Sequence, residues 1–446
     1  MSERPRTEPA RGMRDFLPDE VRRREYVIGL ITRVYERYGF EPLETPAVEN
    51  IETLLGKYGE EGNQLIYKIL KRGEHEASGQ ADLALRYDLT VPLARVVAQH
   101  QSKLPRLFKR YQIQPVWRAD RPARGRFREF YQCDVDALGS TSPVVEAELC
   151  AAVSDALTEL GFNDFVIRIN HRQLLTALLA WAGVVEGQQS DALVVLDKLD
   201  KIGADGVKNE LAARGIEAEA SDALLSFFTS HSGVVLDMIA KAIENDAVGS
   251  AAWTNLQDIM HLTAGTSAAG RLHLDLSLAR GLSYYTGAIM EINVPDLAGS
   301  LGGGGRYDNL VGMFLGQDIP ACGFSLGLER ILVVMGERSM FPTTLAMTPA
   351  DVMLATFDAA AMGDAMRVAA TLRAAGLRVL VYPEPDKIGK QIKYADGRGI
   401  PFVALLGENE ITGGTVTVKH LAAQTQHTYS QSEAGSKILE VLTQRG

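Results

Sequence analysis

Arginine side chains are concentrated in one short stretch of this chain, and a further arginine lies far from it in the sequence. The stretch contains Arg118, Arg121, Arg124, Arg126 and Arg128, which fall within eleven residues. It leads into a strand-like run at 130–136, and Arg330 ends the separate segment 323–330. Guanidinium groups stay charged and bind phosphate oxygens in pairs. The pattern therefore predicts a polyanion held against a rigid sheet.

A basic run of this kind can also form a solvated surface loop, so the neighbouring residues are needed to choose between the two. Gln132 and Asp136 lie four residues apart in the strand-like run, which places both side chains on one face of a strand. Arg330 is followed by apolar residues at 331–334, which predicts a largely apolar helix. An arginine buried there needs an anionic partner, either a carboxylate or a ligand phosphate. Both features favour a binding site.

Two glycine-containing segments could contribute to the same pocket. Residues 279–287 hold Arg280, Tyr284 and Tyr285 between glycines, and the alternative is an ordinary turn with aromatic packing. Glycines at 302–305 either let the backbone approach a ligand or form a tight turn between strands. They are not a phosphate-binding P-loop, because no Gly-Lys-Ser/Thr sequence follows them.

Length, composition and charge narrow the class of protein. The chain has 446 residues, of which 46% are hydrophobic and 23% charged, as in globular proteins of more than one domain. The net charge of −10 restricts any nucleic-acid surface to a local patch. The start of the chain is polar, and no apolar run reaches the length of a membrane span. We therefore expect a cytoplasmic protein with no membrane partner.

Cysteine and histidine usage argues against a disulfide framework and against a metal site. Cys133, Cys150 and Cys322 are far apart and odd in number, and no CxxC spacing occurs. We expect each of them to be a core residue in a reducing compartment. The eight histidines show no HxxH or HExxH pairing, so no metal site made from dedicated protein ligands is expected.

Hydrophobic periodicity predicts the elements that position these residues. A helix at 20–38, ended by Gly39, precedes an extended stretch at 40–46. Short strands then alternate with a helix at 91–101, and Asp88 is either the cap of that helix or a polar group of the pocket. Further along, the pattern predicts a helix at 144–160 and strands at 166–169, 272–276 and 287–294.

Changes in the pattern of predicted helices and strands divide the chain into three parts. Residues 171–265 form a predicted helical insertion, with helices at 173–181, 191–201, 222–228 and 234–244. Residues 1–170 and 266–338 form the predicted sheet-based domain around it. Prolines and small residues interrupt the pattern near 339–349, and strands and helices alternate beyond it. This alternation predicts a small α/β domain with a parallel sheet at 349–446.

Together these segments resemble the histidyl-tRNA synthetases, a family of class II aminoacyl-tRNA synthetases, over nearly the whole chain. The resemblance is carried by a motif 1 pattern at 20–46, a motif 2 pattern at 116–130, a motif 3 pattern at 323–330 and two segments similar to the histidine-specific signatures, at 278–285 and 302–307. The amino-acid sequences of segments 85–92 and 128–134 are similar to those of the eukaryote-type branch of the family, which also occurs in some bacteria.

The resemblance implies an α+β fold: the antiparallel sheet of class II synthetases with flanking helices, the helical insertion, and a C-terminal α/β anticodon-binding domain. It implies a homodimer formed through motif 1. It also implies the reaction, in which histidine and ATP with Mg²⁺ give histidyl-adenylate and pyrophosphate, and histidine then passes to the 3′ end of tRNA(His). Positioning and charge neutralisation supply most of the catalysis in such phosphoryl transfers.

The resemblance also assigns roles to the residues at the phosphate end of the site. Arg118 is expected to hold the α-phosphate and act in catalysis, while Arg126 and Arg330 hold the outer phosphates. Phe130 is expected to stack on adenine, and Asp120 belongs to the same ATP-binding set.

At the amino-acid end, the family's special catalytic arginine corresponds to Arg280, near the α-phosphate and the histidine. The other residues expected to bind histidine are Asp88, Thr90 and Gln132 at the α-amino group, Asp136 and Tyr285 at the imidazole, and Tyr284 and Tyr307 in the pocket wall. A carboxylate and a phenol on the two ring nitrogens would reject isosteric side chains. Asp136 is shorter than the Glu of many bacterial members, so its contact is either direct or bridged by water.

One residue departs from the family pattern, because Ser283 stands where Asp is usual. The departure bears on how Arg280 and its loop are held. It is also the only feature that favours a non-catalytic relative, such as the regulatory subunit of ATP phosphoribosyltransferase, over an enzyme. A synthetase for another amino acid is the second alternative. Lys387, Lys390, Lys393 and Lys419 are candidate tRNA contacts in the C-terminal domain, although lysines on a helix commonly form a solvated face.

Overall fold

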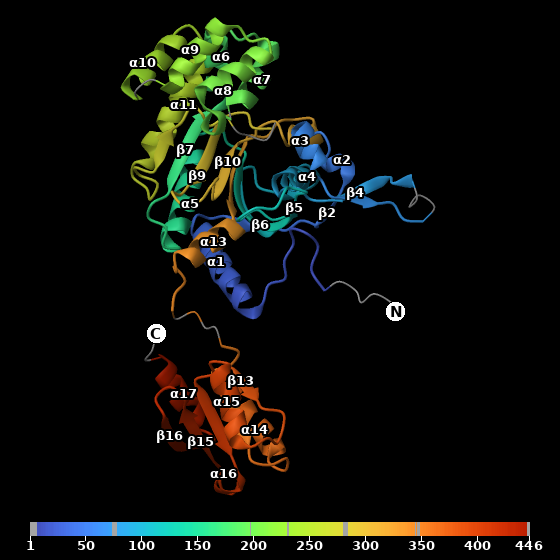
Figure 1. Ribbon diagram of the computed structural model, residues 1–446, viewed down its shortest axis with the longest axis vertical. Coiled ribbons are helices and arrows are strands. Elements are labelled where there is room, and N and C mark those ends of the chain that lie inside the picture. Colours follow the sequence, from blue (N-terminus) through green and yellow to red (C-terminus); the bar gives the residue numbers. More distant parts are fainter. Residues whose placement is uncertain are drawn as a thin grey trace. The chain divides into compact units, whose positions relative to one another are not determined.

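Figure 1 shows the fold as a computed structural model, which describes residues 7–73, 78–196, 198–229, 232–279, 284–343, 345 and 348–443. The chain forms two compact units, Met1–Phe341 and Pro342–Gly446. The division falls inside the stretch 339–349, where the sequence pattern is interrupted. Each unit has hydrophobic cores of its own.

The first unit is built on an eight-stranded sheet. Its strand order is β1 (Glu41–Pro42), β5 (Phe108–Trp117), β6 (Glu129–Leu138), β11 (Ala321–Gly327), β10 (Gly302–Arg306), β9 (Ala288–Asn293), β7 (Val166–His171) and β8 (Leu272–Leu274). The inner strands pair antiparallel, and the two edge pairs, β1 with β5 and β7 with β8, are parallel. The expected antiparallel-rich class II fold is confirmed.

Three helices cover one face of this sheet: α1 (Pro18–Arg37), α5 (Val144–Glu159) and α13 (Leu328–Glu337). The apolar stripe of α1, including Val27, Ile31 and Val34, packs with these helices and the sheet in one core. Asp19 and Glu20 lie in the first turn of α1, where carboxylates suit the positive end of the helix dipole. The face of the sheet turned away from these helices is left for polar side chains.

A smaller layer lies at the β5 end of the sheet. It consists of a three-stranded sheet in the order β2 (Val48–Asn50), β4 (Ala81–Leu85) and β3 (Lys68–Leu70), with α2 (Ile51–Leu54), α3 (Gly59–Gln64), α4 (Thr90–His100) and the 3-10 turn η2 (Gln101–Lys103). Its core includes Leu93 of α4 and also Tyr284, Tyr307 and Ala321 from the far part of the chain. Residues 81–100 are thereby brought against the polar face of the large sheet.

The helical insertion has more helices than the sequence pattern predicts. They are α6 (Arg172–Trp181), α7 (Glu186–Leu196), α8 (Leu199–Ala213), α9 (Ala218–Thr229), α10 (Ser232–Ala242) and α11 (Ala247–Thr263), which Figure 1 shows together at one end of the unit. The single helix expected at 191–201 is wrong, because α7 ends at Leu196 and α8 begins at Leu199. Gly203 then bends α8 with a φ of +69°. The sequence reading also missed α11, although Asp246 caps it by accepting from the backbone of Val248 and Gly249.

The second unit contains a five-stranded sheet with helices. Its strand order is β13 (Val379–Val381), β12 (Val352–Thr356), β14 (Phe402–Leu406), β15 (Thr415–His420) and β16 (Thr425–Ser430), and its helices are α14 (Met362–Ala374), α15 (Ile388–Gly397), α16 (Glu408–Gly413) and α17 (Ala434–Thr443). Only β13, β12 and β14 are parallel, and β15 and β16 form an antiparallel hairpin at the edge. The all-parallel expectation is therefore wrong, because the polar strand β16 alternates too weakly to be recognised in the sequence.

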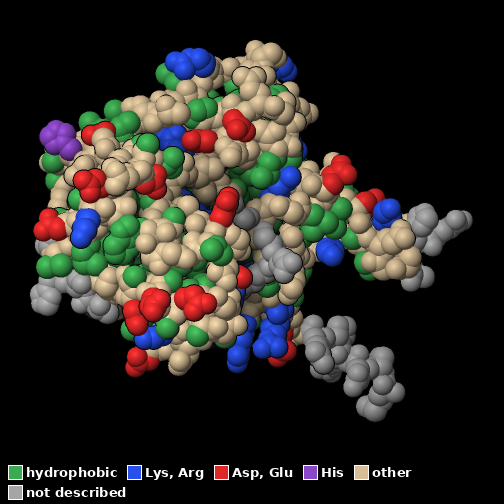
Figure 2. Space-filling view, turned by 90° about the horizontal axis from the view of Figure 1, so that it is seen from above, with side chains coloured by type: hydrophobic (Ala, Val, Ile, Leu, Met, Phe, Trp, Pro, Cys, Tyr) green, Lys and Arg blue, Asp and Glu red, His purple; other side chains and the backbone are tan. Residues whose placement is uncertain are grey.

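Helix α4 ends at His100. The short helix α12 (Gly312–Leu315) is a single turn. No helix in the described part of the chain is long and apolar enough to cross a membrane. Cys133, Cys150 and Cys322 are free and buried, as expected for core residues. On the face drawn in Figure 2, Lys and Arg side chains occur in small groups among acidic, hydrophobic and other groups.

Candidate active site

A cavity of about 590 Å³ lies on the polar face of the large sheet. Cys133 and Val135 of β6 point into the core beneath α1 and α5, so the alternate residues of that strand point toward the cavity side. The wall includes ten of the predicted site residues: Asp88, Thr90, Arg118, Asp120, Arg126, Phe130, Gln132, Tyr284, Tyr285 and Arg330. Segments separated by more than two hundred residues thus meet at one place. The geometry agrees with the binding-site interpretation of the arginine cluster.

The arginines at this cavity are held by neutral and acidic groups of the protein. The Nε of Arg118 donates to the carbonyl of Tyr87 at 3.0 Å, and its guanidinium lies 5.2 Å from the ring centre of Phe130. Arg126 pairs with Asp120 at 2.7 Å, and Arg330 donates to the carbonyl of Ser300. Arg330 is half-buried in the wall, where its charge can meet a ligand phosphate.

Asp88 combines the two interpretations that the sequence left open. One carboxylate oxygen accepts from the backbone of Val91 at 3.1 Å, which caps the first turn of α4. The same carboxylate accepts from the hydroxyls of Tyr58 at 3.0 Å and Tyr284 at 3.2 Å. Burial raises the pKa of Asp88, and the nearby charge of Arg118 opposes the shift. The residue is therefore a cap whose carboxylate also faces the cavity.

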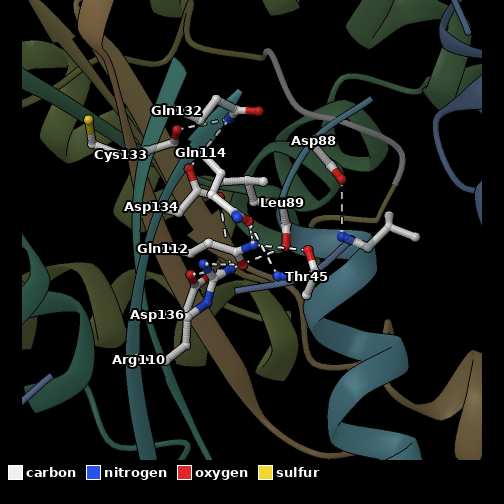
Figure 3. A network of polar contacts seen from close by, with 12 residues as sticks. Thr45, Asp88, Leu89, Arg110, Gln112, Gln114, Gln132, Cys133, Asp134 and Asp136 are labelled. Atoms are coloured by element: carbon white, nitrogen blue, oxygen red, sulfur yellow. Dashed lines mark hydrogen bonds and ion pairs between the residues drawn. The ribbon is translucent and has the colours of Figure 1, made fainter. Parts of the chain in front are cut away.

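Below the cavity, two neighbouring strands carry a buried polar ladder. Gln132, Asp134 and Asp136 of β6 pair with Gln114, Gln112 and Arg110 of β5, residue for residue. Figure 3 shows these side chains together between the two strands and the start of α4. The guanidinium of Arg110 is 2.9 Å from Asp136 and 3.9 Å from Asp134. One cation therefore serves two buried carboxylates.

Asp136 and Tyr307 lie deeper than the cavity wall among the described residues. The Tyr307 hydroxyl donates to Asp136, which also pairs with Arg110. Burial raises the pKa of Asp136, and Arg110 and Tyr307 oppose this. Asp136 occupies space beside Gly323, where a Cβ would lie 1.9 Å from its carboxylate oxygen. The structure therefore places these two predicted residues below the cavity wall and not at the surface of the cavity.

The glycine run forms an inner strand of the sheet. Gly302–Arg306 is β10, paired on both sides, so the turn interpretation is wrong. A Cβ on Gly304 would lie 2.1 Å from the carbonyl oxygen of Gly323, and one on Gly302 would lie 2.3 Å from that of Ser325. Glycine lets β10 and β11 approach closely beneath the cavity.

Several residues of the site were not found from the sequence. The cavity wall also contains Phe127, Lys201, Ser325 and Glu329, and Asp134 lies directly below it. Glu329 pairs with Arg24 of α1 at 2.8 Å and accepts from the backbone of Tyr131 at 2.9 Å. In the sequence, the signal that could have identified Glu329 was its position beside Arg330 in an apolar run. Lys201 belongs to the helical insertion, so only the tertiary structure relates it to this site. Arg280 and Ser283 lie outside the described residues.

Comparison with known proteins decides the family. The Histidyl-tRNA synthetase family model matches residues 12–331, and the anticodon binding domain model matches residues 351–441. The chain belongs to the histidyl-tRNA synthetase family. The histidine–tRNA ligase of Christiangramia forsetii is 42% identical over 439 residues, which cover 93% of this chain and 95% of that protein. That of Gloeobacter violaceus is 41% identical and covers 96% of this chain and 97% of its own length.

Solved structures agree with this membership of the histidyl-tRNA synthetase family. The crystal structure of histidyl-tRNA synthetase from Nostoc sp. PCC 7120 has a TM-score of 0.81 and 32% identity, covering 98% of this chain and all of that one. An ATP phosphoribosyltransferase regulatory subunit/histidyl-tRNA synthetase from Bacillus halodurans has a TM-score of 0.73 but 21% identity, so it shares the fold alone. The resemblance seen in the sequence is confirmed at the level of the family. The eukaryote-type branch is not supported by these comparisons.

The predicted tRNA contacts of this synthetase-family chain lie in the second unit. Lys387 precedes α15, and Lys390 and Lys393 are exposed on it. Lys419 on β15 pairs across the sheet with Val403, which belongs to the core beneath α15, so Lys419 is on the α15 side of the sheet. Lys390 also pairs with Asp386 at 2.7 Å, which reduces its availability to a phosphate. In the part of the chain that the structure describes, no group of three or more His, Cys, Asp or Glu residues could hold a metal ion.

Proposed function

We propose that this protein is a histidine–tRNA ligase, EC 6.1.1.21, which activates histidine with ATP and transfers it to tRNA(His). The observation that carries the proposal is the joining of two kinds of group in one cavity. Arg118, Arg126 and Arg330 supply cationic forks for phosphates, while Asp88 and Gln132 supply oxygen acceptors for an ammonium group. An enzyme that activates histidine needs the phosphate-binding groups and the ammonium-binding groups close together in one site.

In the first step a carboxylate oxygen of histidine attacks the α-phosphorus of ATP, and pyrophosphate leaves as the P–O bond breaks. Arg118 neutralises charge that develops at the α-phosphate, and Arg126 and Arg330 hold the outer phosphates. Mg²⁺ enters with ATP as part of the substrate. The arginines are already fixed by protein contacts, so little reorganisation accompanies the charge transfer.

In the second step a ribose hydroxyl at the tRNA 3′ end attacks the carbonyl carbon of the adenylate, and AMP leaves. The anticodon-binding unit, with Lys387, Lys390, Lys393 and Lys419, supports recognition of the tRNA. Phosphate contacts of this type weaken as salt rises. A homodimer through the motif 1 region and a cytoplasmic location complete the proposal; the free cysteines fit a reducing compartment.

The roles of Asp136, Tyr285, Tyr307 and Arg280 remain part of this proposal. Asp136 lies below the residues of the cavity wall. A water-bridged contact between Asp136 and the imidazole is therefore favoured over a direct one. The alternative of a regulatory subunit shares this fold, and the presence of Arg118, Arg126 and Arg330 together in the described cavity wall favours the enzyme.

The test is ATP–pyrophosphate exchange with histidine and, separately, with each of the other nineteen amino acids. Exchange with histidine alone, followed by charging of tRNA(His), is the expected result. A folded protein that exchanges with no amino acid would support the regulatory alternative, and Ser283→Asp would then be the first variant to restore activity.

A further inference from the structure

Asp134 is a buried carboxylate that the proposed reaction does not use. It lies on β6 between Gln132 and Asp136, opposite Gln112 on β5 and Ser325 on β11. Its side chain is 2% exposed. Arg110, the nearest cation, is closer to Asp136, donates to Gln112 and Leu89, and reaches Asp134 only at 3.9 Å. Asp134 therefore shares this arginine with Asp136, which pairs with it more closely.

Two residues of the cavity wall are also close to Asp134. The amide nitrogen Nε2 of Gln132 donates to the Ser325 hydroxyl at 2.9 Å and approaches the Asp134 carboxylate at 3.5 Å. Ser325 lies directly opposite Asp134 on the neighbouring strand β11. The Gln132 amide nitrogen thus has two oxygen acceptors at the cavity wall, the Ser325 hydroxyl and the Asp134 carboxylate.

These two acceptors determine which end of the Gln132 amide faces the ligand. An ionised carboxylate accepts hydrogen bonds and donates none, so the amide nitrogen, which can only donate, turns toward Asp134 and Ser325. The opposite amide atom, Oε1, turns toward Arg118 in the cavity, 3.5 Å from its Nη2. An oxygen in that position is an acceptor for an ammonium group, whereas a nitrogen there would repel one.

We propose that Asp134 is a positioning residue, which together with Ser325 holds the Gln132 amide with its oxygen toward the α-ammonium group of the amino acid. This inference rests on the proposed function, because it concerns the substrate of the same site. It adds Asp134 and Ser325 to the residues that determine recognition of the amino acid. It also explains why a buried strand face carries a carboxylate in addition to Asp136.

Two conservative variants test this inference. Asp134→Asn keeps the shape but can donate as well as accept, and Ser325→Ala removes the hydroxyl acceptor. Each should raise the KM for histidine by about tenfold, the effect of one hydrogen bond to a charged group, with the KM for ATP unchanged. The double variant should lose less than the product of the two effects, because both residues act on the same amide group. Ser154→Ala is the matched control: Ser154 is buried, and its hydroxyl has no partner among the described residues.

A substrate analogue separates positioning from general damage. Imidazole-4-propanoate lacks the ammonium group, so its inhibition constant should be the same in the wild type, Asp134→Asn and Ser325→Ala. Weaker binding of both histidine and this analogue would show a distorted pocket and overturn the inference. An unchanged KM for histidine in Ser325→Ala would overturn it as well. Failure of the proposed function is distinguishable, because the wild type itself would then show no histidine-dependent exchange.

Discussion

Arg330 lies where a single side chain can decide whether ATP is held for reaction. It belongs to α13, lines the cavity and is oriented by the Ser300 carbonyl. Replacing it by alanine should remove a cation from the outer phosphates and abolish exchange, a loss of roughly a thousandfold or more. The variant should stay folded and keep the assembly state of the wild type, as checked by sedimentation.

Arg338 provides the matched control for this prediction. It follows α13 directly and pairs with Asp164 at the surface, away from the described cavity wall. Arg338→Ala should keep exchange close to wild type. An active Arg330→Ala variant, or one that dissociates, would contradict the role assigned to Arg330.

Asp134 makes a second prediction at the residue scale. Burial raises its pKa to about 7; Arg110 opposes the shift, and the charges of Asp136 and Asp88 reinforce it. An ammonium group bound nearby favours the ionised form, so the pKa falls on binding. Near pH 7 histidine should therefore release up to about half a proton to solvent. Calorimetry in two buffers of different ionisation enthalpy measures this, and Asp134→Asn should reduce the difference between buffers.

At the scale of elements, β10 depends on glycine for its close approach to β11. A Cβ on Gly304 would meet backbone atoms of β11, the Gly323 oxygen at 2.1 Å and the Phe324 Cα at 2.8 Å. Backbone cannot move aside cheaply within a paired sheet, so Gly304→Ala should lower the free energy of unfolding by about 2 kcal/mol or more. Chemical unfolding followed by circular dichroism gives the comparison.

Gly303→Ala is the adjacent control, because its Cβ would meet only the Met290 oxygen, at 3.1 Å. We expect a smaller loss of stability there. Equal losses in the two variants would show that general strand propensity, and not the approach of β11, requires glycine in β10.

The junction of β7 and α6 predicts a pH dependence. Nδ1 of His171 accepts from the backbone of Gln173 at 3.2 Å, which requires a neutral ring. Burial, reinforced by Arg306, lowers the pKa of His171 to about 4, below the unfolded value of about 6.5. The unfolded state therefore takes up a proton first as pH falls below 6.5. Stability should drop by about 2 kcal/mol between pH 8 and pH 5 from this residue alone.

His171→Asn tests the sign of that effect. An asparagine oxygen can cap α6 without titrating, so the variant should lose less stability than the wild type on acidification. Thermal unfolding of both proteins from pH 8 to pH 5 is the measurement. Parallel curves would exclude His171 as the source of the acid sensitivity.

At the scale of the whole molecule, the chain separates into two units that serve different parts of the proposed reaction. All described residues of the cavity wall lie in Met1–Phe341, and the four candidate lysines lie in Pro342–Gly446. A chain ending at Phe341 should therefore keep histidine-dependent exchange while charging tRNA(His) with a higher KM, by tenfold or more if several phosphate contacts are lost. Loss of exchange in the folded truncated protein would show that the second unit supports the cavity.

Local patterns identified much of the fold because helices and strands bury one face. The stripe of Val27, Ile31 and Val34 predicted α1, and the helix predicted at 173–181 is α6, which begins one residue earlier. Where the signal was weak, the prediction failed. The strand β16 is mostly exposed and carries no apolar alternation, and Gly203 divides α8 by a backbone conformation that the sequence does not specify.

The sequence by itself determined the types of group at the site, the family to which the chain belongs, and those elements whose apolar pattern is strong. Arginine forks, carboxylates and glycines are visible in it because their chemistry and spacing are local properties. Only the tertiary structure decided depth and direction. It placed Asp136 and Tyr307 behind the cavity wall, turned the glycine run into an inner strand, and brought Ser325 against Asp134 and Gln132. The physical reason is that register and burial arise between segments far apart in the chain, which no local pattern encodes.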